Sequence, residues 1–340
     1  MKKALKIVGV VILGLAIGLI AYVFLTTPKL PEDADSVIEE VMKAEIPELV
    51  KGETGFVENE GVKTWYESIM PVGTSKGTIL LFMGISNDAL GWPQSFLDKF
   101  VHSGYQMIRF DYRGTGFSDW KKHDYSLTDL ATDAKIILDS LNIEKANLLG
   151  ISLGGMVAQE FAINFPSRTN TLISVMSSGN ILDDELPPIS SKIAFELIKT
   201  GIKYGIVPSE KNTIKLHLAA RQILQGSADY DLDIRGLSEQ VLYNLRARNG
   251  YNAGASRQHH EASYRSGSRY DKLEELKTPI LIIHGSNDPF IPIEHSKKLA
   301  NILPFAKTKW INNMGHDIPG NLIDTIYTVI DHTIAGSLKK

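Results

Sequence analysis

The sequence predicts an α/β fold in which a mostly parallel central sheet carries helices on both faces. From residue 55 onward, short apolar runs alternate with helix-length segments, as in chains that build a parallel sheet from strand–helix–strand units. Hydrophobic residues make up 43% of the chain and charged residues 22%, which suffices to bury a core. The region 181–268 interrupts the alternation, because it is helix-rich and lacks a clear strand. We therefore predict a helical cap inserted at 181–268.

The first 28 residues predict an N-terminal membrane anchor. The run from Ile7 to Leu25 is uncharged. At a rise of about 1.5 Å per residue it nearly matches a hydrocarbon core about 30 Å thick. A cleaved signal peptide is the alternative, although its apolar region is usually shorter and ends in a small-residue cleavage site. Lysines at positions 2, 3 and 6 precede the run. The positive-inside rule then predicts a single-pass helix with the large domain outside the cytoplasm, in the periplasm or at the cell surface.

Residues 29–54 are acidic and interrupted by prolines, which predicts a stalk between the anchor and the domain. Val37, Ile38 and Val41 form one apolar stripe of a short helix that either docks on the domain or stays solvated. We interpret the segment as a solvated spacer. The core then occupies 55–180 and 269–340, on either side of the cap.

The core elements follow from the spacing of apolar residues. Short apolar or alternating runs predict strands at 64–69, 78–82, 106–110, 146–149, 171–176, 279–283 and 308–311. Apolar residues three and four positions apart predict helices at 92–103 and 126–141. Ser126 opens the second of these as its N-cap, with Asp129 three positions on. Two more helices are expected at 294–303 and 322–334.

Composition argues against several classes of function. The 36 Lys and Arg against 39 Asp and Glu give a net charge of −3 without a basic block, which argues against nucleic-acid binding. The absence of cysteine excludes thiol catalysis, disulfides and thiolate metal sites. His259, His260 and Glu261 are adjacent, so their side chains diverge on a helix and do not predict a metal site. No phosphate-binding loop is recognisable. We expect neither a metal nor another cofactor.

Ser152 is the candidate nucleophile. The segment Gly150-x-Ser152-x-Gly154 follows a predicted buried strand and precedes an apolar helix-like stretch. A sharp strand-to-helix turn requires small neighbours and lifts the serine hydroxyl above the sheet at a helix N-terminus. The alternative is a serine that only caps the helix.

Asp288 and His316 are the candidate acid and base. Asp288 follows the predicted strand 279–283 in a proline-flanked turn, where a carboxylate can hold a histidine ring in one tautomer. An Asx turn or a helix N-cap is the alternative for this residue. His316 lies in a glycine-containing loop after the last strand, and none of the other eight histidines is placed in this way. The order Ser, Asp, His along the chain is the one expected for an α/β-hydrolase.

With these motifs, the chain resembles the α/β-hydrolase superfamily from about Gly52 to Ile334. The resemblance implies an oxyanion hole formed by the backbone N–H groups of Ile85 and Leu153. It also implies that Asp111 and Arg113 brace loops rather than react. Met83 departs from the family pattern, which commonly has a histidine at this position. Segments 83–93 and 109–118 are more narrowly similar to aclacinomycin methylesterase-like hydrolases, which implies cleavage of a carboxylic ester.

The predicted function is therefore hydrolysis of a small-molecule ester through an acyl-serine intermediate. The predicted location near a bilayer motivates the hypothesis of a lipophilic substrate. Two alternatives remain. In one, the same three residues act on a thioester, lactone, amide or carbon–carbon bond, or in perhydrolysis. In the other, an inactive hydrolase domain serves as a membrane-tethered receptor or scaffold.

Overall fold

An eight-stranded sheet forms the centre of the protein, in the order β1-β2-β4-β3-β5-β6-β7-β8. The computed structural model describes residues 2–228, 230–303 and 305–337, with the side chains of residues 2–11, 16 and 19 left out. The strands are β1 (Glu53–Asn59), β2 (Val62–Ile69), β3 (Gly77–Phe82), β4 (Tyr105–Phe110), β5 (Ala146–Ile151), β6 (Thr169–Val175), β7 (Ile280–Gly285) and β8 (Lys307–Ile311). Only the β1–β2 and β2–β4 pairs are antiparallel among these neighbours. The predicted mostly parallel sheet is confirmed, whereas β1 has no counterpart among the predicted strands.

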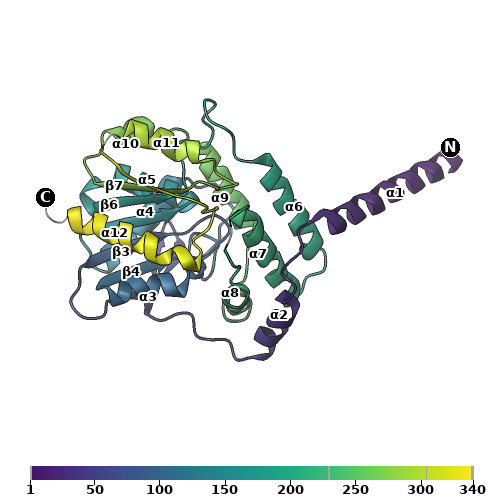
Figure 1. The fold of residues 1–340 in the computed structure, drawn as a ribbon, viewed down its shortest axis with the longest axis horizontal. Coiled ribbons are helices and arrows are strands. Elements are labelled where there is room, and N and C mark those ends of the chain that lie inside the picture. Colours follow the sequence, from purple (N-terminus) through teal and green to yellow (C-terminus); the bar gives the residue numbers. More distant parts are fainter. Residues whose placement is uncertain (1, 229, 304, 338–340) are drawn as a thin grey trace.

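Helices cover both faces of the sheet, as predicted (Figure 1). Alternate residues of β3 point to opposite faces: Ile79 and Leu81 belong to one core cluster, and Leu80 and Phe82 to the other. The first cluster includes α3 (Gln94–His102) and α12 (Ile323–Ser337). The second includes α4 (Leu127–Ser140), α5 (Leu153–Asn164) and α11 (Ile293–Ile302). Ser126 and Asp129 form the predicted capping box at the start of α4.

Between β6 and β7 the chain forms helices, and the described residues of 181–268 contain no strand. These helices are α6 (Ser191–Gly205), α7 (Glu210–Gln225), α8 (Ile234–Ala247) and α9 (Ala253–Arg265), followed by α10 (Tyr270–Glu274). Figure 1 shows α6, α7 and α8 beside the sheet, on the side from which the N-terminal segment extends. We call α6–α9 the cap.

The N-terminal helix α1 (Lys2–Thr26) projects from the rest of the protein (Figure 1). In the part of the chain that the structure describes, no helix combines the length and the apolarity needed to cross a membrane. The predicted span 7–25 includes residues whose side chains lie outside that description. The anchor therefore stays a prediction.

The interpretation of residues 29–54 as a solvated spacer is wrong for the helix that they contain. Helix α2 (Ala34–Lys43) buries its apolar stripe against α7 and α8. Its buried residues share a cluster with those of the two cap helices: Ala34, Ile38, Val41, Ile214, Leu218, Ile234, Val241 and Leu242. Lys211 of α7 also pairs with Asp35 and Glu39. The predicted apolar stripe exists, and the cap provides the surface that covers it.

This packing predicts that the protein loses stability when a buried apolar side chain of α2 is truncated. Ile38 is fully buried in the cluster, so Ile38→Ala should lower the free energy of unfolding by about 2–4 kcal/mol through lost burial and a residual cavity. Denaturant unfolding of the full chain, followed by tryptophan fluorescence, measures the change. Ser36→Ala, at an exposed position of the same helix, should change stability by less than about 0.5 kcal/mol. Equal stability of the two variants would mean that α2 is not docked in solution.

Candidate active site

Ser152 occupies a strained turn between β5 and α5. Its backbone has φ 54° and ψ −123°, a conformation that side-chain-bearing residues rarely adopt. A Cβ atom on Gly150 would overlap the carbonyl of Gly154, and one on Gly154 would overlap the carbonyl of Phe82. The two glycines of the motif are therefore required by close backbone approach. They allow β5 to pass directly into α5 with the serine at the corner.

The structure brings Ser152, His316 and Asp288 together in one hydrogen-bonded row. The Ser152 Oγ atom lies 2.9 Å from His316 Nε2, and His316 Nδ1 lies 2.7 Å from Asp288 Oδ2. An ionised carboxylate only accepts hydrogen bonds, so Nδ1 carries the proton in the neutral ring. Nε2 is then free to accept the proton of the serine hydroxyl. This arrangement can turn a serine into a nucleophile.

Loops at the ends of neighbouring parallel strands hold the acid and the imidazole. Asp288 follows β7, and its Oδ1 atom accepts the N–H groups of Phe290 at 2.9 Å and Ile291 at 3.0 Å. The Asx-type turn weighed as an alternative for Asp288 is thus present, formed by one carboxylate oxygen while the other faces His316. His316 follows β8, and its backbone N–H donates to the Leu224 carbonyl of α7 at 2.8 Å. The cap therefore contacts the histidine loop directly.

A second histidine, His284, also contacts Asp288. His284 lies at the end of β7 with its Nε2 atom 3.2 Å from Asp288 Oδ2 and its Nδ1 atom 2.7 Å from Ser296 Oγ. Burial acts to raise the pKa of Asp288, but the charge of His316 and hydrogen bonds from His284 and His316 outweigh it and hold this pKa well below its usual value. Asp288 is therefore ionised at neutral pH. The signal in the sequence that could have identified this contact is the position of His284, four residues before Asp288.

The two residues predicted to supply oxyanion donors flank Ser152. Leu153 is the first residue of α5, where helix N–H groups lack intrahelical partners. Ile85 lies in the loop after β3, next to Gly84, whose Cβ position would be 3.6 Å from the Ser152 Cβ. Met83 is buried in the same core cluster as Trp92 of the following turn. The loop that carries Ile85 is thus held by apolar packing of Met83, at the position where the family pattern has a histidine.

Asp111 and Arg113 brace loops, as the resemblance implied. The Asp111 carboxylate accepts the N–H groups of Ala89 and Phe117, both at 2.9 Å. It thereby joins the turn beyond Ile85 to the loop after β4. Arg113 forms a two-pronged pair with Asp133 of α4, at 2.6 and 2.8 Å.

Arg248, which sequence reasoning missed, ties the cap to these loops. Its guanidinium pairs with Asp111 and, at 3.3 Å, with Asp88. It lies over the rings of Trp65 and Phe117, 4.6 and 4.7 Å from their centroids. Burial, partly opposed by Arg248, raises the pKa of Asp111 to about 7. The two buried acids thus depend on one arginine contributed by the cap.

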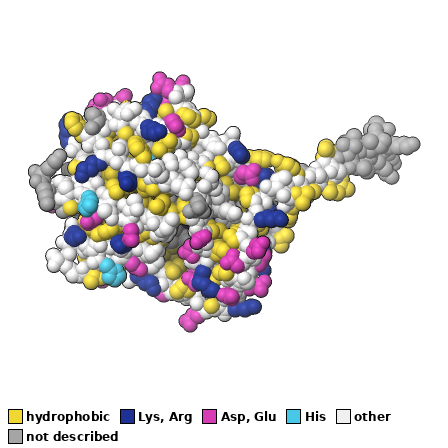
Figure 2. All heavy atoms as spheres, in the orientation of Figure 1, with side chains coloured by type: hydrophobic (Ala, Val, Ile, Leu, Met, Phe, Trp, Pro, Cys, Tyr) yellow, Lys and Arg dark blue, Asp and Glu magenta, His cyan; other side chains and the backbone are white. Residues whose placement is uncertain are grey.

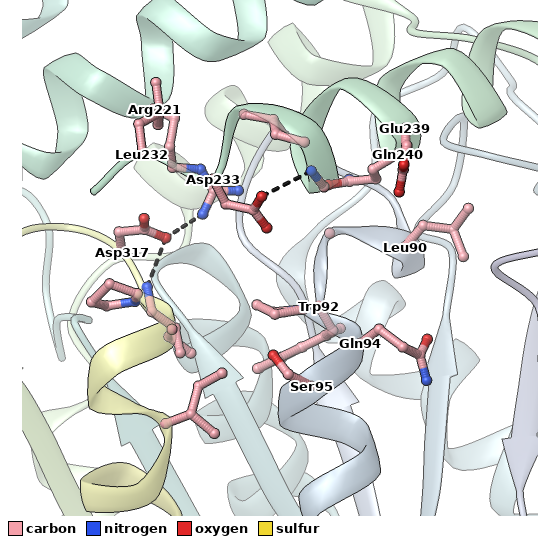
Figure 3. A pocket seen from close by; sticks show the side chains of 18 of the residues that line it. Leu90, Trp92, Gln94, Ser95, Arg221, Leu232, Asp233, Glu239, Gln240 and Asp317 are labelled. Atoms are coloured by element: carbon pink, nitrogen blue, oxygen red, sulfur yellow. Dashed lines mark hydrogen bonds and ion pairs between the residues drawn. The ribbon is translucent and has the colours of Figure 1, made fainter. Parts of the chain in front are cut away.

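A cavity of about 760 Å³ lies beside the histidine loop, between α8 and the start of α3 (Figure 3). Asp317 and Ile318, which directly follow His316, contribute to its wall. Arg221 of α7 points toward Asp317 across the cavity and pairs with it (Figure 3). Ser152 does not line this cavity. It is a space between cap and core next to the row of Ser152, His316 and Asp288, large enough for a small organic molecule.

Comparisons with known proteins show the family and the fold of the chain. A profile of the alpha/beta hydrolase fold family matches residues 77–319. Rhodomycin D methylesterase DnrP of Streptomyces peucetius is 30% identical over 290 residues, covering 78% of this chain and 93% of that protein. A 2-hydroxy-6-oxononadienedioate/2-hydroxy-6-oxononatrienedioate hydrolase of Paraburkholderia phymatum is 28% identical over 252 residues, covering 72% and 82%. A solved carboxylesterase structure from Nitrososphaera gargenis superposes with a TM-score of 0.65 at 18% identity, covering 84% and 99%, which is a likeness of fold.

The turn at Ser152 generates a stability prediction. In Gly154→Ala the new Cβ meets the Phe82 backbone, which cannot move without disturbing β3, so we expect a loss of about 3 kcal/mol or a failure to fold. Gly320→Ala is the matched control, because no atom lies within 4 Å of the added Cβ. Thermal unfolding of both variants, monitored by circular dichroism, compares them. A Gly154→Ala protein as stable as Gly320→Ala would contradict the described turn.

Proposed function

Because the chain belongs to the alpha/beta hydrolase fold family, we propose that it is a serine hydrolase that cleaves a carboxylic ester through an acyl-enzyme. The observation that carries this proposal is the hydrogen-bonded row from Ser152 through His316 to Asp288. The methylesterase relatives, at 30% identity, favour an ester over the other bonds that such a row can cleave.

In the first half of the proposed reaction, Ser152 attacks the ester carbonyl while His316 Nε2 takes the hydroxyl proton. Asp288 keeps the imidazole in the required tautomer and stabilises the imidazolium that forms. The N–H groups of Ile85 and Leu153 receive the negative charge that develops on the carbonyl oxygen. Collapse of the tetrahedral intermediate transfers the proton from His316 to the departing alcohol and leaves the acyl group on Ser152.

In the second half, a water molecule replaces the alcohol. His316 removes a proton from this water as it attacks the acyl carbonyl, and the same two N–H groups receive the charge again. The carboxylic acid leaves when His316 returns the proton to the Ser152 oxygen. The enzyme is thereby restored, and the kinetics are expected to be ping-pong.

Carbon–carbon bond hydrolysis is the second candidate function, because one group of curated relatives carries names of that reaction at 26–28% identity. The same three residues would serve there. A direct competition between ester and dienoate substrates on the purified protein separates the two functions.

The proposal predicts a specific set of mutational losses. With p-nitrophenyl esters of increasing acyl length, Ser152→Ala and His316→Ala should lower kcat by about 10⁴–10⁶, and Asp288→Asn by less, because the three residues act as one unit. Ser140→Ala and His332→Ala, both at exposed positions, should leave kcat unchanged. Steady-state kinetics of the full chain in detergent micelles measure these effects.

Three results would overturn parts of this proposal. Near-normal turnover in His316→Ala would remove the base assignment. Folded protein that reacts with a fluorophosphonate probe at Ser152 but hydrolyses no ester would shift the function to another bond. Folded protein without any labelling would favour the receptor or scaffold alternative.

We further propose that residues 7–25 anchor the chain as a single-pass helix, with the hydrolase domain on the extracytoplasmic side and a lipophilic ester as its substrate. The uncharged run and the lysines before it support the anchor. Among the described residues of α1, several large apolar side chains are exposed: Ile12, Leu13, Leu15, Ile17, Ile20, Tyr22, Phe24 and Leu25. Equal rates on water-soluble and membrane-partitioned esters would remove the reason to expect a lipophilic substrate.

The anchor is tested by extraction of bacterial membranes with alkaline carbonate. The full chain should stay in the membrane pellet, whereas Leu15→Arg with Ile17→Arg should release it, because each central arginine costs about 2.5–3.5 kcal/mol on insertion scales. Lys122→Ala, an exposed change in the hydrolase domain, should not affect the pellet fraction. Recovery of the unmodified chain in the supernatant would refute the anchor.

A further inference from the structure

Helix α6 of the cap exposes apolar side chains on one side. Its fully buried residues are Lys199, 3% exposed, and Thr200, 0% exposed. Its outward side chains include Phe195, 47% exposed, and Ile198, 58% exposed, and the helix is followed by Ile206, also 58% exposed. At 3.6 residues per turn these three apolar residues lie on one side of the helix. The solvent-exposed side of a helix usually carries polar residues. The exposed apolar residues of α6 therefore indicate that an apolar partner covers this face.

The buried lysine of α6 joins the helix to the end of α1. The Lys199 ammonium lies 3.1 Å from Thr26 Oγ1 and 3.4 Å from the Thr26 carbonyl, at the C-terminus of α1, where a cation is favourable. It also lies over the ring of Tyr22, 5.6 Å from the centroid, and pairs with Glu196 at 2.9 Å. Lys199 is therefore buried by contacts with α1, although it projects from the same side of α6 as Phe195.

The apolar face of α6 lies close to an apolar surface on α1. Figure 1 shows α6 beside the C-terminal end of α1, and the two helices are in contact. At that end Tyr22, Phe24 and Leu25 are exposed, Leu25 by 83%. Figure 2 shows hydrophobic side chains gathered on the described part of α1 where it leaves the body.

The place where α6 contacts α1 indicates which partner covers the apolar face of α6. Lys199 touches α1 at Tyr22, in the last turn of the span 7–25 proposed above as the anchor, and at Thr26, the residue that follows this span. In that anchor, residues 22–26 lie at the level of the lipid headgroups. Aromatic and lysine side chains are typical of this level, and Tyr22, Phe195 and Lys199 meet there.

We propose that the exposed face of α6, formed by Phe195, Ile198 and Ile206, rests in the headgroup region of the bilayer that holds α1. This proposal depends on the α1 anchor. It adds a second contact with the bilayer, in which α6 of the cap lies along the membrane surface. It has a consequence for the site. Helix α6 packs on α7, and the Leu224 carbonyl of α7 accepts the N–H of His316, so a single helix separates the bilayer contact from the catalytic loop.

A single introduced cysteine tests this contact, since the chain contains no other thiol. The full-length variants Ile198→Cys and Asn301→Cys are labelled with an environment-sensitive fluorophore and reconstituted into phosphatidylcholine–phosphatidylglycerol vesicles. Asn301 is an exposed residue of α11 and serves as the matched control. We expect lipids brominated near the headgroup to quench the probe at 198 several-fold more than the probe at 301, and aqueous iodide to show the reverse order.

Three outcomes would overturn the proposal. Equal iodide quenching at 198 and 301 in vesicle-bound protein would place α6 in water while leaving the α1 anchor intact. Shielding at 198 that disappears on dilution of the protein in lipid, together with a 198–198 cross-link, would assign the face to a second copy of the chain. Failure of the chain to enter vesicles would reject both α6 docking and the anchor. None of these readouts depends on ester hydrolysis, so they are independent of the proposed reaction.

Discussion

The backbone turn at Ser152 is the constraint on which the rest of the site depends. A non-glycine residue at φ 54° persists only when its surroundings hold it, and here β5 passes into α5 with the backbones of β3 and α5 in contact through Gly154. This fixes the Ser152 hydroxyl above the end of the sheet. Asp288 and His316 lie close to this hydroxyl because the loops that carry them follow β7 and β8, which end at the same edge of the parallel sheet.

The features predicted correctly from the sequence are those recorded in local patterns. Buried parallel strands appear in the sequence as short apolar runs. The N-cap of α4 can be predicted from Ser126 and Asp129 alone. Strand β1 has no such pattern, because Val57 is its only buried residue and its existence depends on pairing with β2. The stripe on α2 was visible in the sequence, but its burial was not, since the surface that covers it belongs to helices about 180 to 200 residues further along the chain.

The buried charge cluster was equally inaccessible to sequence reasoning. Arg248 and Asp111 are 137 residues apart, and nothing near either residue indicates the other. Two carboxylates and a guanidinium removed from water are stable only when geometry and hydrogen bonds compensate their desolvation. The Asp111 carboxylate meets this condition with two backbone donors, while the guanidinium pairs with both carboxylates and lies over the rings of Trp65 and Phe117. Arg248 therefore fixes the cap in register with the loop that carries Ile85.

The N-terminal segment is fixed to the cap at two separate places. Helix α1 meets α6 through Lys199, and α2 packs on α7 and α8 through Ile38 and its neighbours. The cap in turn holds the core through Arg248 and through Leu224 at the histidine loop. Each joint is buried or hydrogen-bonded, so the orientation of the candidate active site relative to α1 is set by packing rather than by the length of a flexible linker. A flexible stalk would let the candidate site take any orientation relative to α1, whereas the two packed contacts allow a single orientation.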